Sequence, residues 1–296
     1  MSLARSIRER GEQRHQSRKI ALIRRAPELE RIIEFTSEKG ASHVYTALPL
    51  EKYGFAIKAK RDFRDILNMR YRRTIKNLPE FCVCGKPYSL DHSQSCKRGG
   101  FIHMRHAQPQ EAFAEEAKQC FHDVQLEPPL EPLSGEQMKH KSAITSDDAR
   151  SDLRIRSFWT NMSNAFLEFR VFDPFAVTHS NKPPSVLYKS IANIRRREYG
   201  QRVREVEDGD FTPMIMSSTG GMGPEMHMAL KHLANKLVDK KGGSYTRTMS
   251  LLRCKFAFAM ARAALVCLRG SRGLWPKRAS HGVMDSVELS YAELRL

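Results

Sequence analysis

Two acidic residues and an arginine in the middle of the chain have the types and spacing that could bind a divalent cation. Asp152 is the second residue of one apolar-rich run, 151–159, and Glu168 and Arg170 lie in a second run, 165–172, after a polar loop of hairpin length. The pattern predicts strand, turn, strand. Because strand side chains alternate between faces, Glu168 and Arg170 share a face, and Asp152 should lie close to them from the neighbouring strand.

Two carboxylates beside a cation are typical of sites that hydrolyse phosphodiesters with Mg²⁺ or Mn²⁺. Asp152 and Glu168 would hold the metal, and Arg170 would polarise a phosphate oxygen or orient the attacking water. The alternative is a half-exposed hairpin with ordinary surface charges, since an acidic residue two positions before a basic one is common in strands.

The segments around the hairpin predict an α/β domain. From 108 to 218 the expected order is helix, three strands, helix, strand, and two more helices follow. The expected helices and strands cover 111–121, 123–127, 186–206, 211–218, 226–238 and 251–268. The last helix is apolar nearly all round, which predicts burial. The glycine cluster 220–223 lacks the spacing and the lysine of a phosphate-binding loop, so a plain turn is favoured over a nucleotide site.

A second group of residues has the spacing of a metal site. Its pattern is Cys-x-Cys-x7-His-x3-Cys, at Cys82, Cys84, His92 and Cys96. Four such ligands within a short, turn-rich segment favour structural Zn²⁺ in a small knuckle. The alternatives are buried thiols near an unrelated histidine, or His103 or His106 as the fourth ligand. Cys120, Cys254 and Cys267 stand in apolar helical contexts and are expected in the core.

The charge of the chain favours a polyanionic partner. Its 296 residues contain 50 Lys and Arg against 33 Asp and Glu, a formal net charge of +17. Nucleic acid is the first expectation and an anionic membrane surface the second, although ribosomal and histone-like proteins share this composition. The basic residues singled out for nucleic-acid contact are Arg72, Arg73, Lys97, Arg98, Arg195, Arg196 and Arg197. A solvated helix is the alternative for the basic segments.

The sequence shows neither a secretory signal nor a transmembrane run. The first 25 residues are rich in arginine, and the most apolar stretch, 256–268, is short and interrupted by Arg262. An intracellular, reducing location is expected, and a nuclear one if DNA is the partner. Six cysteines in that setting favour thiols or metal ligands over disulfides.

Several motifs resemble the C-terminal region of non-LTR retrotransposon polyproteins over roughly residues 40 to 272. They include Phe63-Arg64-Asp65, Cys82-Val83-Cys84-Gly85-Lys86-Pro87, Asp91-His92, Arg105-His106, Phe169-Arg170-Val171, Arg197-Glu198-Tyr199 and Gly220-Gly221-Met222-Gly223. The resemblance implies a restriction-like endonuclease of the PD-(D/E)xK type that nicks target DNA. It also implies a reverse transcriptase on a longer parent polyprotein, since this chain has no Tyr-x-Asp-Asp polymerase motif.

The fold class that the resemblance implies is α/β, a restriction-endonuclease-like mixed sheet flanked by helices and preceded by a zinc knuckle and a basic helical region. The expected division is a basic arm and helix over 1–39, a basic helical region over 40–80, a Cys-Cys-His-Cys zinc knuckle over 81–106, the endonuclease domain over 107–272 and a tail over 273–296.

By the same resemblance, Asp152 is the motif aspartate, Glu168 the second acid and Arg170 the position of the motif lysine. Arg105 and His106 match the Arg-His pair that follows the knuckle, and Glu111 and Tyr199 are additional candidates.

The chain departs from the family pattern at several positions. Ser151 replaces the expected proline, Ala107 an asparagine, and Glu168 an aspartate. Arg170 cannot lose a proton, so it cannot act as a general base. The competing hypotheses are therefore a metal-dependent DNA endonuclease, a catalytically inactive zinc-containing nucleic-acid-binding module, and a structural chromatin or ribonucleoprotein component.

Overall fold

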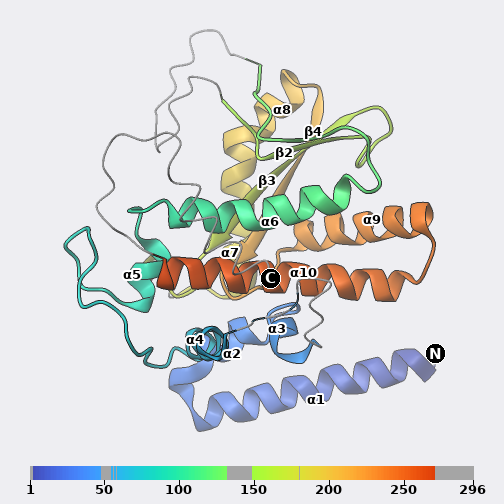
Figure 1. The fold of residues 1–296 in the computed structure, drawn as a ribbon. Helices are drawn as coiled ribbons and strands as arrows, with labels where there is room; N and C mark the ends of the chain where they lie inside the picture. The colour runs from blue at the N-terminus through green and yellow to red at the C-terminus, as the bar shows by residue number, and fades with distance from the viewer. Residues whose placement is uncertain are drawn as a thin grey trace.

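The computed structural model describes residues 3–47, 55, 57, 59–131, 149–179 and 181–270 (Figure 1). The expected tail over 273–296 and part of the basic helical region over 40–80 lie outside them. Within the described residues, none of the helices combines the length and the apolar character that a bilayer crossing requires.

The described residues form a four-stranded mixed sheet in the order β1-β2-β3-β4. Its strands are β1 (Val124–Leu126), β2 (Leu153–Arg156), β3 (Asn164–Phe172) and β4 (Gly209–Ser217). The first three are antiparallel, with Leu153 opposite Leu167, and β4 runs parallel to β3. The expected hairpin is confirmed, although β2 begins one residue after Asp152.

Helices cover both faces of this sheet (Figure 1). One face packs against α6 (Phe101–Ala117), α9 (Pro224–Lys241) and α10 (Tyr245–Arg269). The other face packs against α7 (Pro184–Arg195), a π turn (Arg196–Gly200) and α8 (Gln201–Glu205). The expected coarse fold, a mixed α/β domain with a sheet between helices, is therefore confirmed.

The alternation along β3 explains the two packed layers. Leu167, Phe169 and Val171 belong to the main core with α6, α9 and α10, whereas Phe166 and Phe172 belong to smaller clusters on the α7 and α8 side. Successive strand residues point to opposite faces, so Glu168 and Arg170 lie on the same side as Phe166 and Phe172.

The N-terminal region packs onto the far side of α10. It consists of α1 (Leu3–Arg25), a 3-10 turn (Pro27–Leu29), α2 (Glu30–Thr36), α3 (His43–Thr46) and α4 (Lys60–Arg70). Val44, Phe55 and Ile66 form a buried cluster with α10 side chains that include Cys254 and Phe258. Arg269 of α10 adds an ion pair to the buried Asp65, with Nε 2.7 Å from Oδ2.

Two elements differ from the sequence-based expectation. The expected continuous helix over 186–206 is interrupted by the π turn 196–200. α6 begins at Phe101 and continues without a break across the expected boundary between 106 and 107.

The glycine cluster is a turn between β4 and α9. Gly220 has a φ of +91°, and a Cβ added to Gly221 would lie 1.9 Å from Oε2 of Glu38. That oxygen accepts hydrogen bonds from Tyr188 and Ser217. The glycines therefore make room for a carboxylate from the segment after α2.

Candidate functional site

Three cysteines and a histidine come together in a cluster that could bind zinc. The ligand atoms of Cys82, Cys84, His92 and Cys96 all lie within 4.8 Å of one another. Sγ of Cys82 is 3.7 Å from Sγ of Cys96, and Sγ of Cys84 is 3.3 Å from Nε2 of His92. Tetrahedral Zn²⁺ with Zn–S bonds of about 2.3 Å would place two sulfurs about 3.8 Å apart, so the spacing fits. His103 and His106 are not in this cluster.

Local sequence explains how the four ligands meet. A tight turn returns the amide of Cys82 to the carbonyl of Lys86, and Gly85 supplies a φ of +82°. Ser89 caps α5 (Leu90–Ser95) by accepting a hydrogen bond from the amide of His92. A backbone hydrogen bond at Lys86 lowers the pKa of the Cys84 thiol, which favours the thiolate that a metal requires.

The Cys82–Cys96 segment is held against the helical layer by buried polar contacts. The side chain of Gln94 donates to the carbonyl of Ala264 in α10. Nη1 of Arg105 in α6 donates to the carbonyl and the side-chain oxygen of Gln94, at 2.9 and 3.1 Å. Tyr88 donates to the carbonyl of Leu268, at 2.7 Å. Arg105 is thus tied by two hydrogen bonds to the segment that contains the cysteine–histidine cluster.

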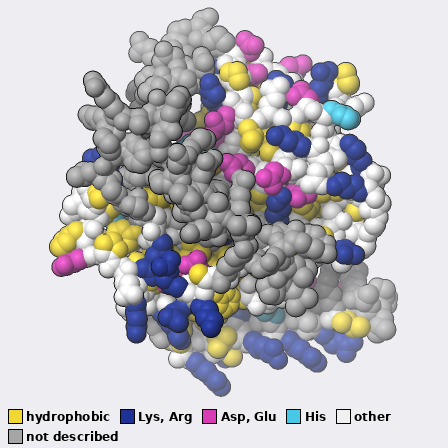
Figure 2. Space-filling view, in the orientation of Figure 1, with side chains coloured by type: hydrophobic (Ala, Val, Ile, Leu, Met, Phe, Trp, Pro, Cys, Tyr) yellow, Lys and Arg dark blue, Asp and Glu magenta, His cyan; other side chains and the backbone are white. Residues whose placement is uncertain are grey.

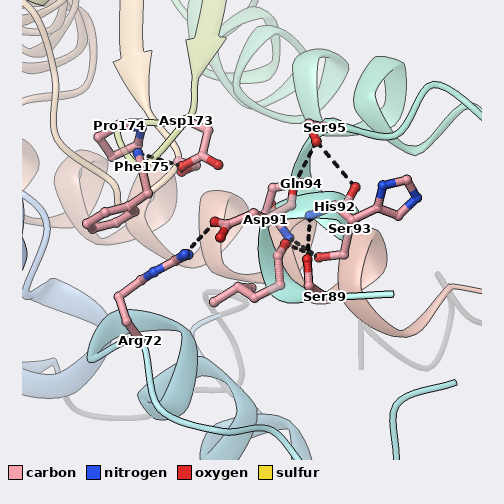
Figure 3. A network of polar contacts seen from close by, with 12 residues as sticks. Arg72, Ser89, Asp91, His92, Ser93, Gln94, Ser95, Asp173, Pro174 and Phe175 are labelled. Carbon is pink, nitrogen blue, oxygen red and sulfur yellow. Dashed lines mark hydrogen bonds and ion pairs between the residues drawn. The ribbon is translucent and has the colours of Figure 1, made fainter. Parts of the chain in front are cut away.

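Arg72 links this segment to the loop after β3. Its guanidinium forms an ion pair with Asp91 and lies 4.7 Å above the ring of Phe175, as the orientation in Figure 3 shows. Phe175 in turn follows Asp173, whose Oδ1 accepts the amide hydrogen of Phe175. Arg72 therefore contributes to the internal packing of this region, unlike the exposed Arg73.

The structure brings Asp152 and Glu168 to one place at the end of the hairpin. Oδ2 of Asp152 accepts the amide hydrogen of Phe169 at 2.6 Å. Nε2 of His106 lies 3.2 and 3.1 Å from the two carboxylate oxygens of Asp152. An ionised carboxylate only accepts hydrogen bonds, so His106 presents an Nε2–H to it.

Glu168 is buried and strongly perturbed. Only 6% of its surface is exposed, and Oε2 has no hydrogen-bond partner among the described residues. Burial, together with the negative charge of Asp152, raises the pKa of Glu168 to about 8, while Arg195 opposes the rise. Without a cation beside it, Glu168 is therefore mostly protonated at neutral pH, and a nearby cation would favour release of that proton.

A cationic cleft of about 1020 Å³ opens beside these residues. His106, Asp173, Glu198 and Tyr199 line it, whereas Asp152 and Glu168 are not among its lining residues. Its positively charged lining comes from separate parts of the chain: Lys97, Arg105, Arg150, Arg170, Arg195 and Arg202. Such a concentration of guanidinium groups is suited to phosphate oxygens.

Arg170 and Tyr199 border the carboxylate pair from the cleft. Desolvation, followed by the charges of Arg195 and Arg105, lowers the pKa of Arg170. Tyr199 stacks on Phe211, and burial, with Glu168 next in importance, raises the pKa of Tyr199.

The other sequence-selected residues are distributed more widely. Arg195 forms a 2.6 Å ion pair with Glu198 inside the cleft, whereas Arg196 pairs with Glu225 outside its lining. Arg98 and Arg197 are exposed but do not line the cleft. Glu111, on α6, is half-buried and accepts a long hydrogen bond from Gln108, at 3.4 Å.

Sequence reasoning missed Arg150, Glu198 and Arg202 as members of one site. Arg202 stands in the expected basic helix and Glu198 in the Arg197-Glu198-Tyr199 motif of the resemblance, but neither position predicts a role in this site. Arg150 follows a proline-rich connection. No local sequence pattern indicates that Arg150, Glu198 and Arg202 line the same cleft as residues of α6.

A comparison with known proteins finds no protein-family model that matches this chain, and no curated protein that is similar to it. The residues of the site therefore have to be interpreted from their own chemistry.

Proposed function

We propose that the chain is a metal-dependent DNA endonuclease of the restriction-like type, related to the C-terminal part of non-LTR retrotransposon polyproteins. The observation that supports this best is the meeting of Asp152 and Glu168 on one side of the sheet, beside a cationic cleft. The order helix, three strands, helix, strand is also the order that the resemblance implies.

The cleft residues would bind and orient a DNA strand. Arg170 and Arg195 lie where a phosphate close to Glu168 would need neutralising charge. Arg170 stays protonated throughout and acts through its charge alone. His106, which also lines the cleft, contacts the carboxylate of Asp152 and so fixes the direction in which that carboxylate points.

One unpartnered oxygen of the carboxylate pair is suited to a hard cation such as Mg²⁺. The buried Oε2 of Glu168 has no partner among the described residues, and a cation would satisfy it. Mg²⁺ or Mn²⁺ held by Asp152 and Glu168 would neutralise charge on the scissile phosphate and increase the acidity of a water molecule. In the Cys82–Cys96 segment, the cluster would hold a structural Zn²⁺ that stabilises one wall of the cleft.

An inactive nucleic-acid-binding module is the second candidate. Within the described part of the chain, the cysteine–histidine cluster is the single group with three or more metal ligands close together. Arg170, in place of the motif lysine, also removes a group that could accept a proton. Such a chain would keep the cationic cleft and the zinc but lack a productive site for Mg²⁺.

Nicking of supercoiled plasmid with Mg²⁺ or Mn²⁺ tests the proposal. Asp152→Asn and Glu168→Gln should each reduce nicking to background, because each removes one carboxylate from the metal site. Asp239→Asn is the matched control, since it makes the same charge change at an exposed position of α9, on the opposite side of the sheet.

DNA affinity should change little in both active-site variants, because cationic contacts to phosphates supply most of it. Salt-dependent DNA binding without nicking by the natural chain, under either metal, would establish the inactive module. Equal nicking by the natural chain and Asp152→Asn would place the chemistry elsewhere.

A further inference from the structure

α1 has a stripe of arginines that faces away from the rest of the molecule. Arg10, Arg14, Arg18 and Arg25 are all exposed. At about 100° per residue, their positions fall within an arc of about 80° on one side of the helix. The other helix positions in this arc are Leu3, Ile7 and Ala21, so the stripe contains no acidic residue.

The opposite side of α1 faces the body of the protein. Lys19 and Ile23 are half-buried there, and α1 packs mainly against the 3-10 turn 27–29 and α2. Glu9 and Glu12 lie roughly 150° from the centre of the arginine stripe by the same helical geometry. The acidic side chains of the helix thus lie away from the stripe.

α1 lacks the apolar face by which a surface helix usually binds a protein groove or a membrane. Ile7 is exposed near the start of the helix, and Ile20 and Leu22 are exposed near its end but on nearly opposite sides, about 160° apart. A membrane-surface helix needs a continuous apolar side, and helix-in-groove binding needs apolar residues at successive turns. A polyanion is the partner whose chemistry matches the stripe.

The stripe is also remote from the cationic cleft. α10 and the layer of α2, α3 and α4 separate α1 from the sheet (Figure 1). Figure 2 shows a row of Lys and Arg side chains along the lower edge, where α1 runs. The two cationic surfaces therefore face different directions.

We propose that α1 is a second nucleic-acid site and binds in the major groove of duplex DNA. An α-helix is about 10–12 Å across and that groove about 12 Å wide. Its 23 residues extend over roughly 34 Å, which is about one turn of DNA. The deep, narrow major groove of A-form RNA does not admit a helix. The site does not depend on cleavage, so an inactive chain would retain it.

The test uses the full chain with all four stripe arginines replaced by glutamine, and a matched variant with all four replaced by lysine. Glutamine and lysine are both good helix formers, so circular dichroism should show that α1 is retained. Fluorescence anisotropy then measures binding to a short duplex DNA, to duplex RNA of the same sequence and to phosphatidylserine vesicles over a range of salt.

The glutamine variant should bind duplex DNA with a salt slope smaller by about 3 to 4, since each lost phosphate contact removes about 0.9. The lysine variant should keep most of the natural slope. Unchanged DNA binding in the glutamine variant would refute the proposal, as would an equal loss on duplex RNA or tighter binding to vesicles than to DNA.

A parallel Arg170→Gln, Arg195→Gln variant separates this site from the cleft. It should impair nicking while leaving the contribution of α1 to the salt slope intact. If only this cleft variant loses DNA affinity, the α1 proposal fails and the cleft proposal stands.

Discussion

Glu168 is the residue whose replacement tests the carboxylate pair most directly. The pKa of Glu168 is about 8 in the folded protein, against an ordinary value of 4.5. Between these two pH values the unfolded chain releases a proton that the folded chain keeps. The contribution of Glu168 to the free energy of unfolding is therefore fully present at low pH and is lost as the pH rises from 4.5 to about 8.

Glu168→Gln should remove this pH dependence, because an amide does not ionise. Each pH unit inside the window costs up to about 1.4 kcal/mol. From pH 6 to pH 8 the variant should therefore gain roughly 2 kcal/mol relative to the natural protein.

Urea unfolding of both proteins at several pH values, without added divalent metal, measures the difference. Subtracting one protein from the other cancels the titration of the cysteine ligands and of other groups. A difference that stays constant from pH 6 to pH 8 would show that Glu168 is already ionised, and the argument from burial would be wrong. Mg²⁺ added at pH 8 should stabilise the natural protein more than the Glu168→Gln variant. The ionised Glu168 carboxylate attracts the cation, and the neutral amide of the variant does not.

Two further predictions concern the metal cluster and the glycine turn. Elemental analysis should find one zinc per chain, and Cys96→Ala should lose most of it and melt at a lower temperature; a full equivalent of zinc in the variant would exclude this ligand set. Gly221→Ala should destabilise the fold by about 1–3 kcal/mol, because the new methyl group would meet Glu38 at 1.9 Å and the Tyr188 hydroxyl at 2.6 Å. Its matched control, Gly11→Ala, has open space around it in α1 and should stabilise the helix by about 0.5–1 kcal/mol, so equal melting temperatures for the two variants would contradict the packing argument.

The hairpin and the cysteine cluster could be predicted because the relevant information is local. Alternation along 165–172 determines which side chains share a face, and the structure has Leu167, Phe169 and Val171 in one core as expected. The three cysteines and the histidine lie close in sequence, and the turn at Gly85 brings them together. Neither feature depends on how distant segments pack.

The cleft could not be predicted, because its walls come from segments that meet only in the folded protein. α6 supplies Arg105 and His106, β3 supplies Arg170, and α7, in the crossover from β3 to β4, supplies Arg195. The parallel pairing of β4 with β3 places that crossover helix over the face that contains Glu168. Apolar periodicity identifies each element but does not indicate which ends of the elements will be neighbours.

The π turn after α7 shows how a small backbone irregularity affects the chemistry of the site. An extra residue in a helical turn rotates everything that follows by about 100° relative to a regular helix. The turn contains Glu198 and Tyr199, which line the cleft, and it leads into α8, whose Val203 is buried in the cluster with Phe166. If the helix were regular and Val203 stayed in that cluster, the residues of the 196–200 segment would be rotated, and a different side of that segment would face Glu168. The same irregularity therefore allows α8 to pack on the sheet while Tyr199 stays beside the buried carboxylate, a combination that regular helical spacing would not have indicated.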